Sequence, residues 1–131
     1  MTPALEAAQR LLSLAQADRD AFLWLIQGPG LRPATVMFSA HQACEKALKA
    51  VMIAHGLVPG RTHNLLALTA ELNENGVPTP FTPDQMAVLN PYAVTFRYAD
   101  EEISLITPAQ ARTLVINLLE WANEALARLT T

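Results

Sequence analysis

The chain contains a single cysteine, Cys44, which excludes a disulfide bond within the chain. Because Cys44 lies among apolar residues of an expected helix, we expect a buried, unreactive thiol. Long hydrophobic runs are also absent, since none reaches the roughly 18 residues that a membrane-spanning helix requires. The first residues lack the basic-then-apolar order of a signal peptide. The sequence therefore predicts a cytoplasmic protein with no membrane contact.

Charged residues are scarce, at 16% of the chain, whereas hydrophobic residues make up 51%. This balance argues against disorder, and we expect one domain over residues 1–131 with one core. The formal net charge of −3 argues against a general nucleic-acid coat protein. Cations nevertheless outnumber acids within residues 31–63. A small anion or a short RNA is expected to be attracted to that region.

Proline, glycine and threonine divide the chain into helices, and no segment alternates regularly enough to indicate a strand. A first helix is expected over about residues 3–26, ended by the Gly-Pro-Gly sequence at 28–30. A second is expected over about 33–55, with Gly56 at its end. The expected apolar face of the first helix comprises Leu11, Leu14, Ala15, Ala21, Phe22 and Leu25.

Three further helices complete the expected fold. Thr62 is the expected cap of a helix over about 63–75. The Thr-Pro-x-Gln sequences at 82–85 and 107–110 are capping boxes that open the fourth and fifth helices. Pro91 should break the fourth helix near Asn90, with a short helix following over 92–98. The sequence thus predicts an all-α, up-and-down bundle of about five helices. The expected apolar side of the fifth helix comprises Leu114, Val115, Leu118, Leu119, Ala122 and Leu126.

The second helix is apolar around most of its circumference and gathers its polar side chains on one strip. At about 100° per residue, the strip covers roughly 140° of the helix. Such a helix is buried on most sides and presents one polar strip, so polar chemistry is expected there. The strip contains His41, Gln42, Glu45, Lys46 and Lys49.

Two interpretations of this strip remain open. It is a solvated face or the rim of a subunit interface, with Glu45 and Lys49 forming an i,i+4 ion pair. Alternatively, Lys46 and Lys49, together with Arg61 and His63 near the start of the next helix, bind a phosphate or another anion.

Arg97 lies between aromatic residues within the segment 95–98, and it too has two readings. It pairs with Glu45 or with an acid of the run at 100–102, or it binds an anion or stacks on a base. Metal sites have little support, because His41, His55 and His63 lack ligand spacing and the acidic run is consecutive. We expect no metal, no cofactor and no catalytic nucleophile.

Three patches together resemble a known family: residues 41–50 (His-Gln-Ala-Cys-Glu-Lys-Ala-Leu-Lys-Ala), residues 61–65 (Arg-Thr-His-Asn-Leu), and residues 89–98, which end in Arg97-Tyr98. In this order and spacing they resemble the HEPN (higher eukaryotes and prokaryotes nucleotide-binding) domain family, over roughly residues 15–125. The resemblance implies an up-and-down helical bundle, commonly a homodimer. Many small prokaryotic members are similar to toxin–antitoxin components encoded beside a minimal nucleotidyltransferase.

Other members of that family are ribonucleases that use an Arg, four to six residues, then a His. No arginine of this chain has a histidine at that spacing. The favoured hypothesis is therefore a non-catalytic HEPN-like binding module with a nucleotidyltransferase partner and possible nucleotide or RNA binding. Two alternatives stay open: a ribonuclease toxin that uses Arg97 with His41 or His63, and a purely structural dimerisation domain. The candidate ligand-binding residues are Gln42, Glu45, Lys46, Lys49, Arg61, His63 and Arg97.

Overall fold

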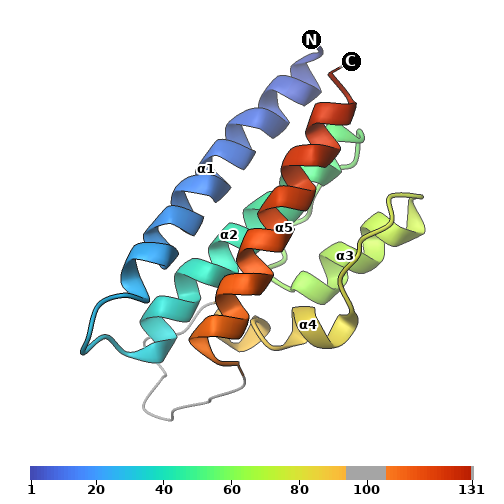
Figure 1. Ribbon diagram of the computed structural model, residues 1–131. Coiled ribbons are helices and arrows are strands. Elements are labelled where there is room, and N and C mark those ends of the chain that lie inside the picture. Colours follow the sequence, from blue (N-terminus) through green and yellow to red (C-terminus); the bar gives the residue numbers. More distant parts are fainter. Residues whose placement is uncertain (94–105, 131) are drawn as a thin grey trace.

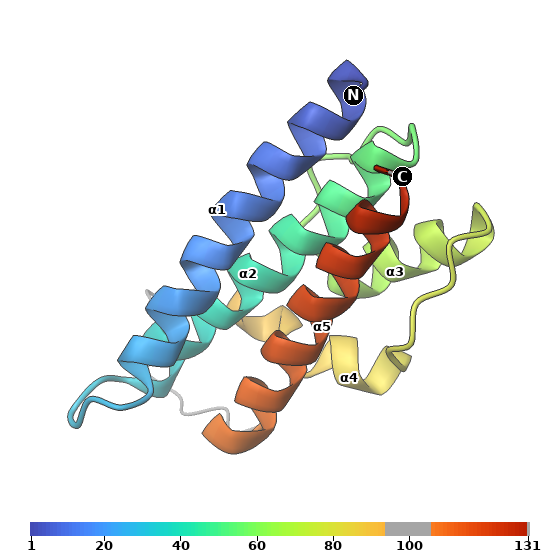
Figure 2. The same cartoon turned by 45° about the horizontal axis from the view of Figure 1, so that its top comes forward.

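The computed structural model describes residues 1–93 and 106–130 of the chain. Three long helices, α1 (Pro3–Leu25), α2 (Pro33–Ala54) and α5 (Pro108–Arg128), lie side by side (Figure 1). Helix α2 runs back along α1, and α5 runs in the same direction as α2 (Figure 2). The predicted all-α bundle of about five helices is confirmed, and no strand occurs in the described residues.

Two short helices and one turn of 3₁₀-helix complete the fold. Helix α3 (Leu65–Glu74) packs against α2, and α4 (Pro83–Ala87) packs against α3. The 3₁₀-helix η1 (Asn90–Tyr92) contacts both α2 and α4. The short elements therefore lie along the side of α2 on which the polar strip was predicted.

Both predicted capping boxes are confirmed. At the start of α4, the Gln85 amide N–H donates to Thr82 Oγ1 at 3.2 Å, and the Thr82 N–H donates to Gln85 Oε1 at 2.8 Å. At the start of α5, Thr107 and Gln110 exchange the same two bonds at 3.1 and 3.0 Å. These bonds satisfy backbone donors that the first turn of a helix leaves unpaired.

The Thr107→Ala substitution is expected to lower the free energy of unfolding by about 1 kcal/mol, because it removes the acceptor of the capping bond. Thr107 is exposed, so the substitution leaves no cavity in the core. Denaturant titration of the two proteins measures the difference. An unchanged midpoint would show that this cap does not stabilise α5.

Helix α3 begins later than predicted, and its cap is Asn64, not Thr62. Asn64 Oδ1 accepts hydrogen bonds from the N–H groups of Leu66 and Ala67, at 3.0 and 3.4 Å. Thr62 Oγ1 instead accepts from the Asn64 N–H at 3.1 Å, which closes a turn just before the helix. The physical reason is that residues 62–64 are turned back against α2, so helical geometry starts only at Leu65.

Helix α4 ends at Ala87, earlier than the predicted break near Asn90. Pro91 has no N–H to donate to the Ala87 carbonyl, and its ring excludes that carbonyl from helical geometry. The chain continues as η1, in which the Tyr92 N–H donates to the Leu89 oxygen at 3.0 Å. The predicted helix over 92–98 therefore begins within a 3₁₀ turn, and its residues 94–98 lie outside the described part.

Helix α2 ends at Ala54, and Gly56 terminates it as predicted by adopting φ +78°. The Gly56 N–H donates to the Ile53 oxygen at 3.0 Å, and the Leu57 N–H donates to the Met52 oxygen at 2.9 Å. This pair of bonds is the Schellman motif. It requires one residue in the left-handed backbone conformation, which glycine adopts without steric cost. It directs the following segment back along α2 towards the start of α3.

The core lies between the three long helices and extends beneath α3, α4 and η1. The predicted apolar side of α5 is entirely buried within it. On α1 the prediction was partly wrong, because Leu14 and Ala21 are exposed whereas Ala15 and Phe22 are buried. Helix α1 has apolar residues on two sides, and only one side can face α2 and α5. No helix of the described ranges is long and apolar enough to cross a membrane.

Candidate functional site

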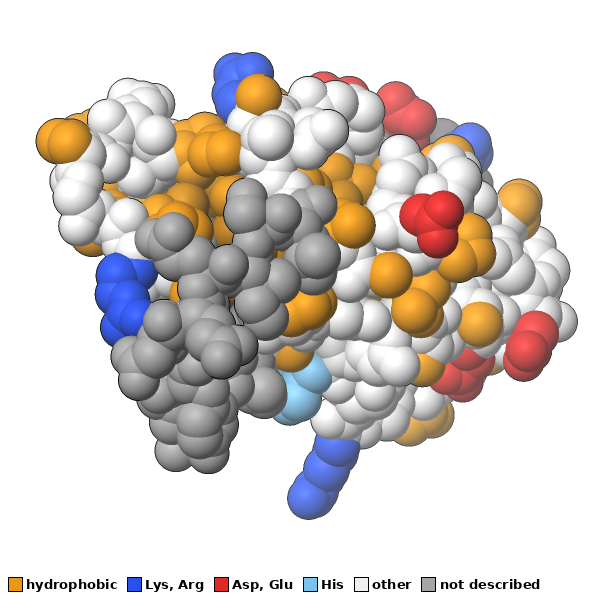
Figure 3. Space-filling model, turned by 90° about the horizontal axis from the view of Figure 1, so that it is seen from below, with side chains coloured by type: hydrophobic (Ala, Val, Ile, Leu, Met, Phe, Trp, Pro, Cys, Tyr) orange, Lys and Arg blue, Asp and Glu red, His pale blue; other side chains and the backbone are white. Residues whose placement is uncertain are grey.

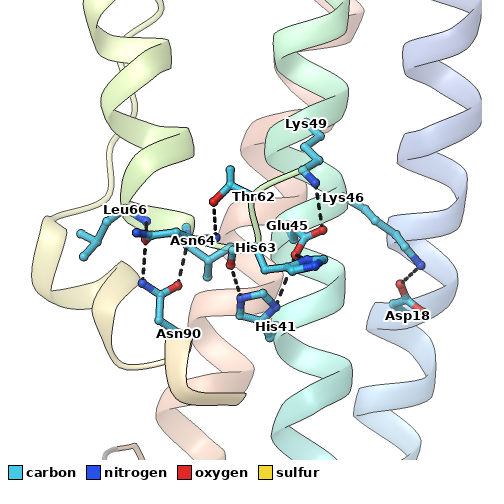
Figure 4. Close-up of polar contacts among 11 residues, drawn as sticks. Asp18, His41, Glu45, Lys46, Lys49, Thr62, His63, Asn64, Leu66 and Asn90 are labelled. Carbon is cyan, nitrogen blue, oxygen red and sulfur yellow. Dashed lines mark hydrogen bonds and ion pairs between the residues drawn. The ribbon is translucent and has the colours of Figure 1, made fainter. Parts of the chain in front are cut away.

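Glu45 is the centre of a polar cluster on the middle of α2 (Figure 4). It is buried, yet both carboxylate oxygens have partners. Oε1 accepts a hydrogen bond from His63 Nδ1 at 2.8 Å, and Oε2 accepts one from Lys49 Nζ at 3.1 Å. The predicted i,i+4 pair of Glu45 and Lys49 is thus confirmed. A buried carboxylate is tolerated when it is both paired with a cation and hydrogen-bonded, as here.

His41 lies one helical turn before Glu45 and is completely buried. Its Nε2 lies 2.9 Å from the backbone oxygen of His63. A carbonyl oxygen can only accept, so Nε2 carries the proton and donates. In the neutral ring Nδ1 then bears a lone pair. Nδ1 lies 3.8 Å from Glu45 Oε1, which is too far for a hydrogen bond, and has no hydrogen-bond partner among the described residues. We call His41, Glu45, Lys49 and His63 the Glu45 cluster.

Burial lowers the pKa of His41 below its ordinary value of 6.5, because desolvation disfavours the charged ring. The Glu45 carboxylate and the hydrogen bond to the His63 carbonyl act in the opposite direction, and the desolvation outweighs them. His41 is therefore neutral at pH 7. Glu45, His63 and Lys49 are the charged or titratable groups that face it.

This pKa shift predicts acid destabilisation. Because the folded-state pKa of His41 lies below the unfolded-state value, the unfolded chain binds the proton more readily. The contribution of His41 to stability is complete above about pH 6.5 and is lost as the pH falls below it. The free energy of unfolding of the wild type should fall more steeply between pH 7 and pH 5 than that of His41→Gln. Glutamine retains an N–H donor for the His63 carbonyl but does not titrate. Equal slopes in chemical denaturation at a series of pH values would contradict the prediction.

His63 is held in place from two sides. The His41 ring binds its backbone oxygen, and Glu45 binds its ring. The next residue, Asn64, accepts a hydrogen bond from Asn90 Nδ2 at 2.9 Å, and Asn90 Oδ1 accepts from the Leu65 N–H at 2.9 Å. The start of α3 is thus fixed by α2 and by η1 together (Figure 4). The His63 side chain remains 52% exposed.

Lys46 points away from the Glu45 cluster and towards α1. Its Nζ donates to Asp18 Oδ2 at 2.6 Å, and both side chains are about one-third exposed. Lys46 and Lys49 are therefore each paired with an acid of the same chain. Their positive charges are locally balanced, so the basic character predicted for this region is much reduced at the strip itself.

Residues 8–126 match the model of the HEPN domain. The chain belongs to the HEPN domain family. No curated protein and no solved structure matches the chain. The matched range contains most of α1 and α5 and the whole of the Glu45 cluster.

The HEPN domain brings only some of the predicted site residues together. Lys49 and His63 both contact Glu45, whereas Lys46 contacts α1. Three others do not take part in the cluster or cannot be placed: Gln42 is half-buried on α2, Arg61 is exposed before His63, and Arg97 lies outside the described residues. The readings of Arg97 and of the acidic run at 100–102 therefore stay predictions.

Sequence reasoning placed His41 on the polar strip and in the ribonuclease alternative but not among the ligand-binding residues, and it did not select Asn64 or Asn90. The i,i+4 spacing of His41 and Glu45 was the one local signal for His41. Asn64 and Asn90 are 26 residues apart, and only packing brings them together.

Cys44 of the HEPN domain is completely buried, and desolvation raises the pKa of its thiol to about 12. The prediction of a buried thiol is confirmed. No group of three His, Cys, Asp or Glu side chains in the described ranges could hold a metal ion.

A groove lies at the opposite side of the HEPN domain from α1, between α4 and the start of α5. Figure 3 shows hydrophobic side chains exposed at this end of the molecule. The groove is mostly apolar, with amide, hydroxyl and carboxylate groups at intervals, and contains none of the predicted site residues. It is lined by residues that include Phe81, Gln85, Val88, Gln110 and Leu114.

Proposed function

We propose that this HEPN domain is a non-catalytic binding module whose partner is a nucleotidyltransferase, as in a toxin–antitoxin pair, and that it forms a homodimer. Membership of the family supports this proposal. So does the sequence, because its three histidines all precede Arg97, and no arginine is followed by a histidine after four to six residues. The sequence thus lacks the closely spaced arginine and histidine that ribonucleases of the family use.

The proposal is based mainly on one observation: the charged side chains of the polar strip are bound to other residues of the same chain. Lys49 is bound to Glu45, Lys46 is bound to Asp18, and His41 is buried and neutral. These side chains hold α1, α2 and the start of α3 together, so they are not free to surround a reacting phosphate. Among the candidate residues that the structure describes, Arg61 and His63 remain exposed at the edge of the cluster for an anionic ligand. Nucleotide or RNA binding is therefore proposed at that edge.

A nucleotidyltransferase encoded in an adjacent reading frame would be the probe for the partner. After co-expression, the two proteins should elute together from a size-exclusion column at micromolar concentration. Separate elution would contradict the proposed partnership.

Calorimetric titration with ATP, GTP and a short RNA tests the nucleotide part of the proposal. Arg61→Ala should weaken binding, whereas Arg112→Ala, an exposed arginine on α5, serves as the matched control. Absence of binding to all three ligands would favour the purely structural dimerisation domain.

A second candidate function, ribonuclease activity, is favoured by one observation. Because His63 Nδ1 donates to a buried carboxylate, the neutral ring presents its lone pair on Nε2, as a general base requires. Arg97 would supply the cation for the phosphate. Incubation of the purified protein with tRNA and mRNA decides between the two. Cleavage that is lost in both Arg97→Ala and His63→Ala, but not in His55→Ala, would overturn the non-catalytic proposal.

A further inference from the structure

Helix α1 has a second apolar face, on the side away from the core. Leu14 is 56% exposed and Trp24 is 76% exposed, and Ala17 and Ala21 between them are exposed as well. In Figures 1 and 2, α1 lies at the outer edge of the bundle, and no other described helix covers its far side. Large apolar side chains favour burial, so an exposed apolar face of this kind is a candidate interaction surface.

The residues of this face follow a heptad repeat. Two series recur every seven residues and are offset by three, which is the a and d spacing of a helix pair. One series is Ala7, Leu14 and Ala21, and the other is Arg10, Ala17 and Trp24. We call these six residues the α1 seam.

The α1 seam is complementary to itself when two copies run antiparallel. In an antiparallel pair each a residue faces a d residue of the other helix. With a two-fold axis at the level of Ala15 and Gln16, every layer then joins one large side chain to one alanine, which allows close packing. The layers are Leu14 with Ala17, Arg10 with Ala21, and Trp24 with Ala7.

Other arrangements of the seam pack less well. Moving the register by one heptad places Leu14 opposite Trp24 and Ala17 opposite Ala21, so that large meets large and small meets small. A parallel pair would place Arg10 opposite its own copy, which opposes like charges. In the antiparallel register the flanking acids do not oppose each other, because Asp20 faces Ser13 and Glu6 faces Gln27.

We propose that the α1 seam is the surface through which two copies of this chain associate, with their α1 helices antiparallel. The occupant is a second copy because the large and small residues of the seam match those of the same seam reversed. This inference names the surface of the proposed homodimer and rests on that part of the proposed function.

Light scattering on size-exclusion fractions over a range of concentrations tests the inference with Ala17→Lys. This variant places a long cation in the central layers and should raise the dimer dissociation constant at least about tenfold. The matched control is Ala70→Lys, the same change at an exposed alanine of α3, which should leave the dimer intact. Circular dichroism should show both variants folded, since both positions are exposed.

Disulfide trapping tests the register. A mixture of Leu14→Cys and Ala17→Cys proteins should form a cross-linked dimer on mild oxidation, because these positions face each other. A mixture of Leu14→Cys and Trp24→Cys, which face each other only in the shifted register, should not. Cys44 does not compete, since it is buried and its thiol pKa is about 12.

The outcomes separate this inference from the proposed function. A dimer that Ala17→Lys leaves unchanged overturns the α1 seam but preserves the homodimer. A wild type that is monomeric at all concentrations overturns both, while partner binding can still be observed. If Ala17→Lys abolishes binding of the nucleotidyltransferase and the wild type is monomeric, the seam binds that partner and not a second copy.

Discussion

Replacing Glu45 with alanine is expected to lower the free energy of unfolding by about 3 kcal/mol. The substitution leaves the Lys49 ammonium and the His63 ring without their common acceptor, in a region where Glu45 itself is buried. Removing one partner of a buried pair is costly because the other charge keeps its desolvation penalty. The start of α3 should also lose order, since His63 is one of its anchors.

Two variants separate the contributions to this loss. Glu45→Gln keeps the shape and one acceptor oxygen but removes the charge, so it should fall between the wild type and alanine. Lys46→Ala breaks an ion pair whose side chains are about one-third exposed, and it should cost about 1 kcal/mol or less. Guanidinium titrations monitored by circular dichroism give the values. A Glu45→Ala protein as stable as Lys46→Ala would show that the cluster does not stabilise the fold.

Leu48→Ala is expected to cost about 3 kcal/mol, through lost apolar burial and the cavity that remains. Leu48 is completely buried on α2, the helix that packs against α1, α3, α5 and η1. Cavity costs are high where the surroundings cannot collapse, and helices packed on several sides of α2 leave little room for movement.

Leu31→Ala is the matched control for the core substitution. Leu31 is exposed in the connection between α1 and α2, so removing the same atoms should change the free energy of unfolding by less than about 0.5 kcal/mol. Denaturant titrations of both variants should therefore differ clearly in midpoint. Similar losses in the two proteins would contradict the described position of the core.

The features of the fold that were predicted correctly are those that depend on neighbouring residues. The boxes at Thr82 and Thr107 involve residues three apart, so their hydrogen bonds can be read from the sequence. The role of Gly56 could also be predicted from the sequence, because the left-handed conformation that ends a helix favours glycine. The start of α3 was predicted less well, because contacts with α2 and η1 decide where its helical geometry begins.

In the candidate site, too, the contacts between neighbouring residues were predictable and those between distant residues were not. The Glu45–Lys49 pair was predictable, because i,i+4 residues meet on any helix. The contact of His41 with His63 joins residues 22 apart, and that of Lys46 with Asp18 joins residues 28 apart. These contacts depend on how separate helices pack, which the local pattern does not specify. They also changed the interpretation of the strip, from a surface open to anions to a set of links between elements.

The two apolar sides of α1 show that the sequence pattern does not specify which side of a helix faces the core. Leu14 and Phe22 are equally hydrophobic in the sequence, yet only Phe22 faces the core. The pattern indicates that both sides avoid water, but the choice between them depends on the shapes of α2 and α5. The side that α2 and α5 do not cover is the α1 seam.

The position of α5 has a consequence for synthesis of the protein. Helices α1 and α2 are joined by a short connection and can pair while the chain is still on the ribosome. Helix α5 contributes buried residues to the same core but is translated after every other described element. Until it arrives, the apolar surface that it covers on α2 stays open to chaperones and to other nascent chains. Translation of residues 108–128 is therefore the step that completes the core.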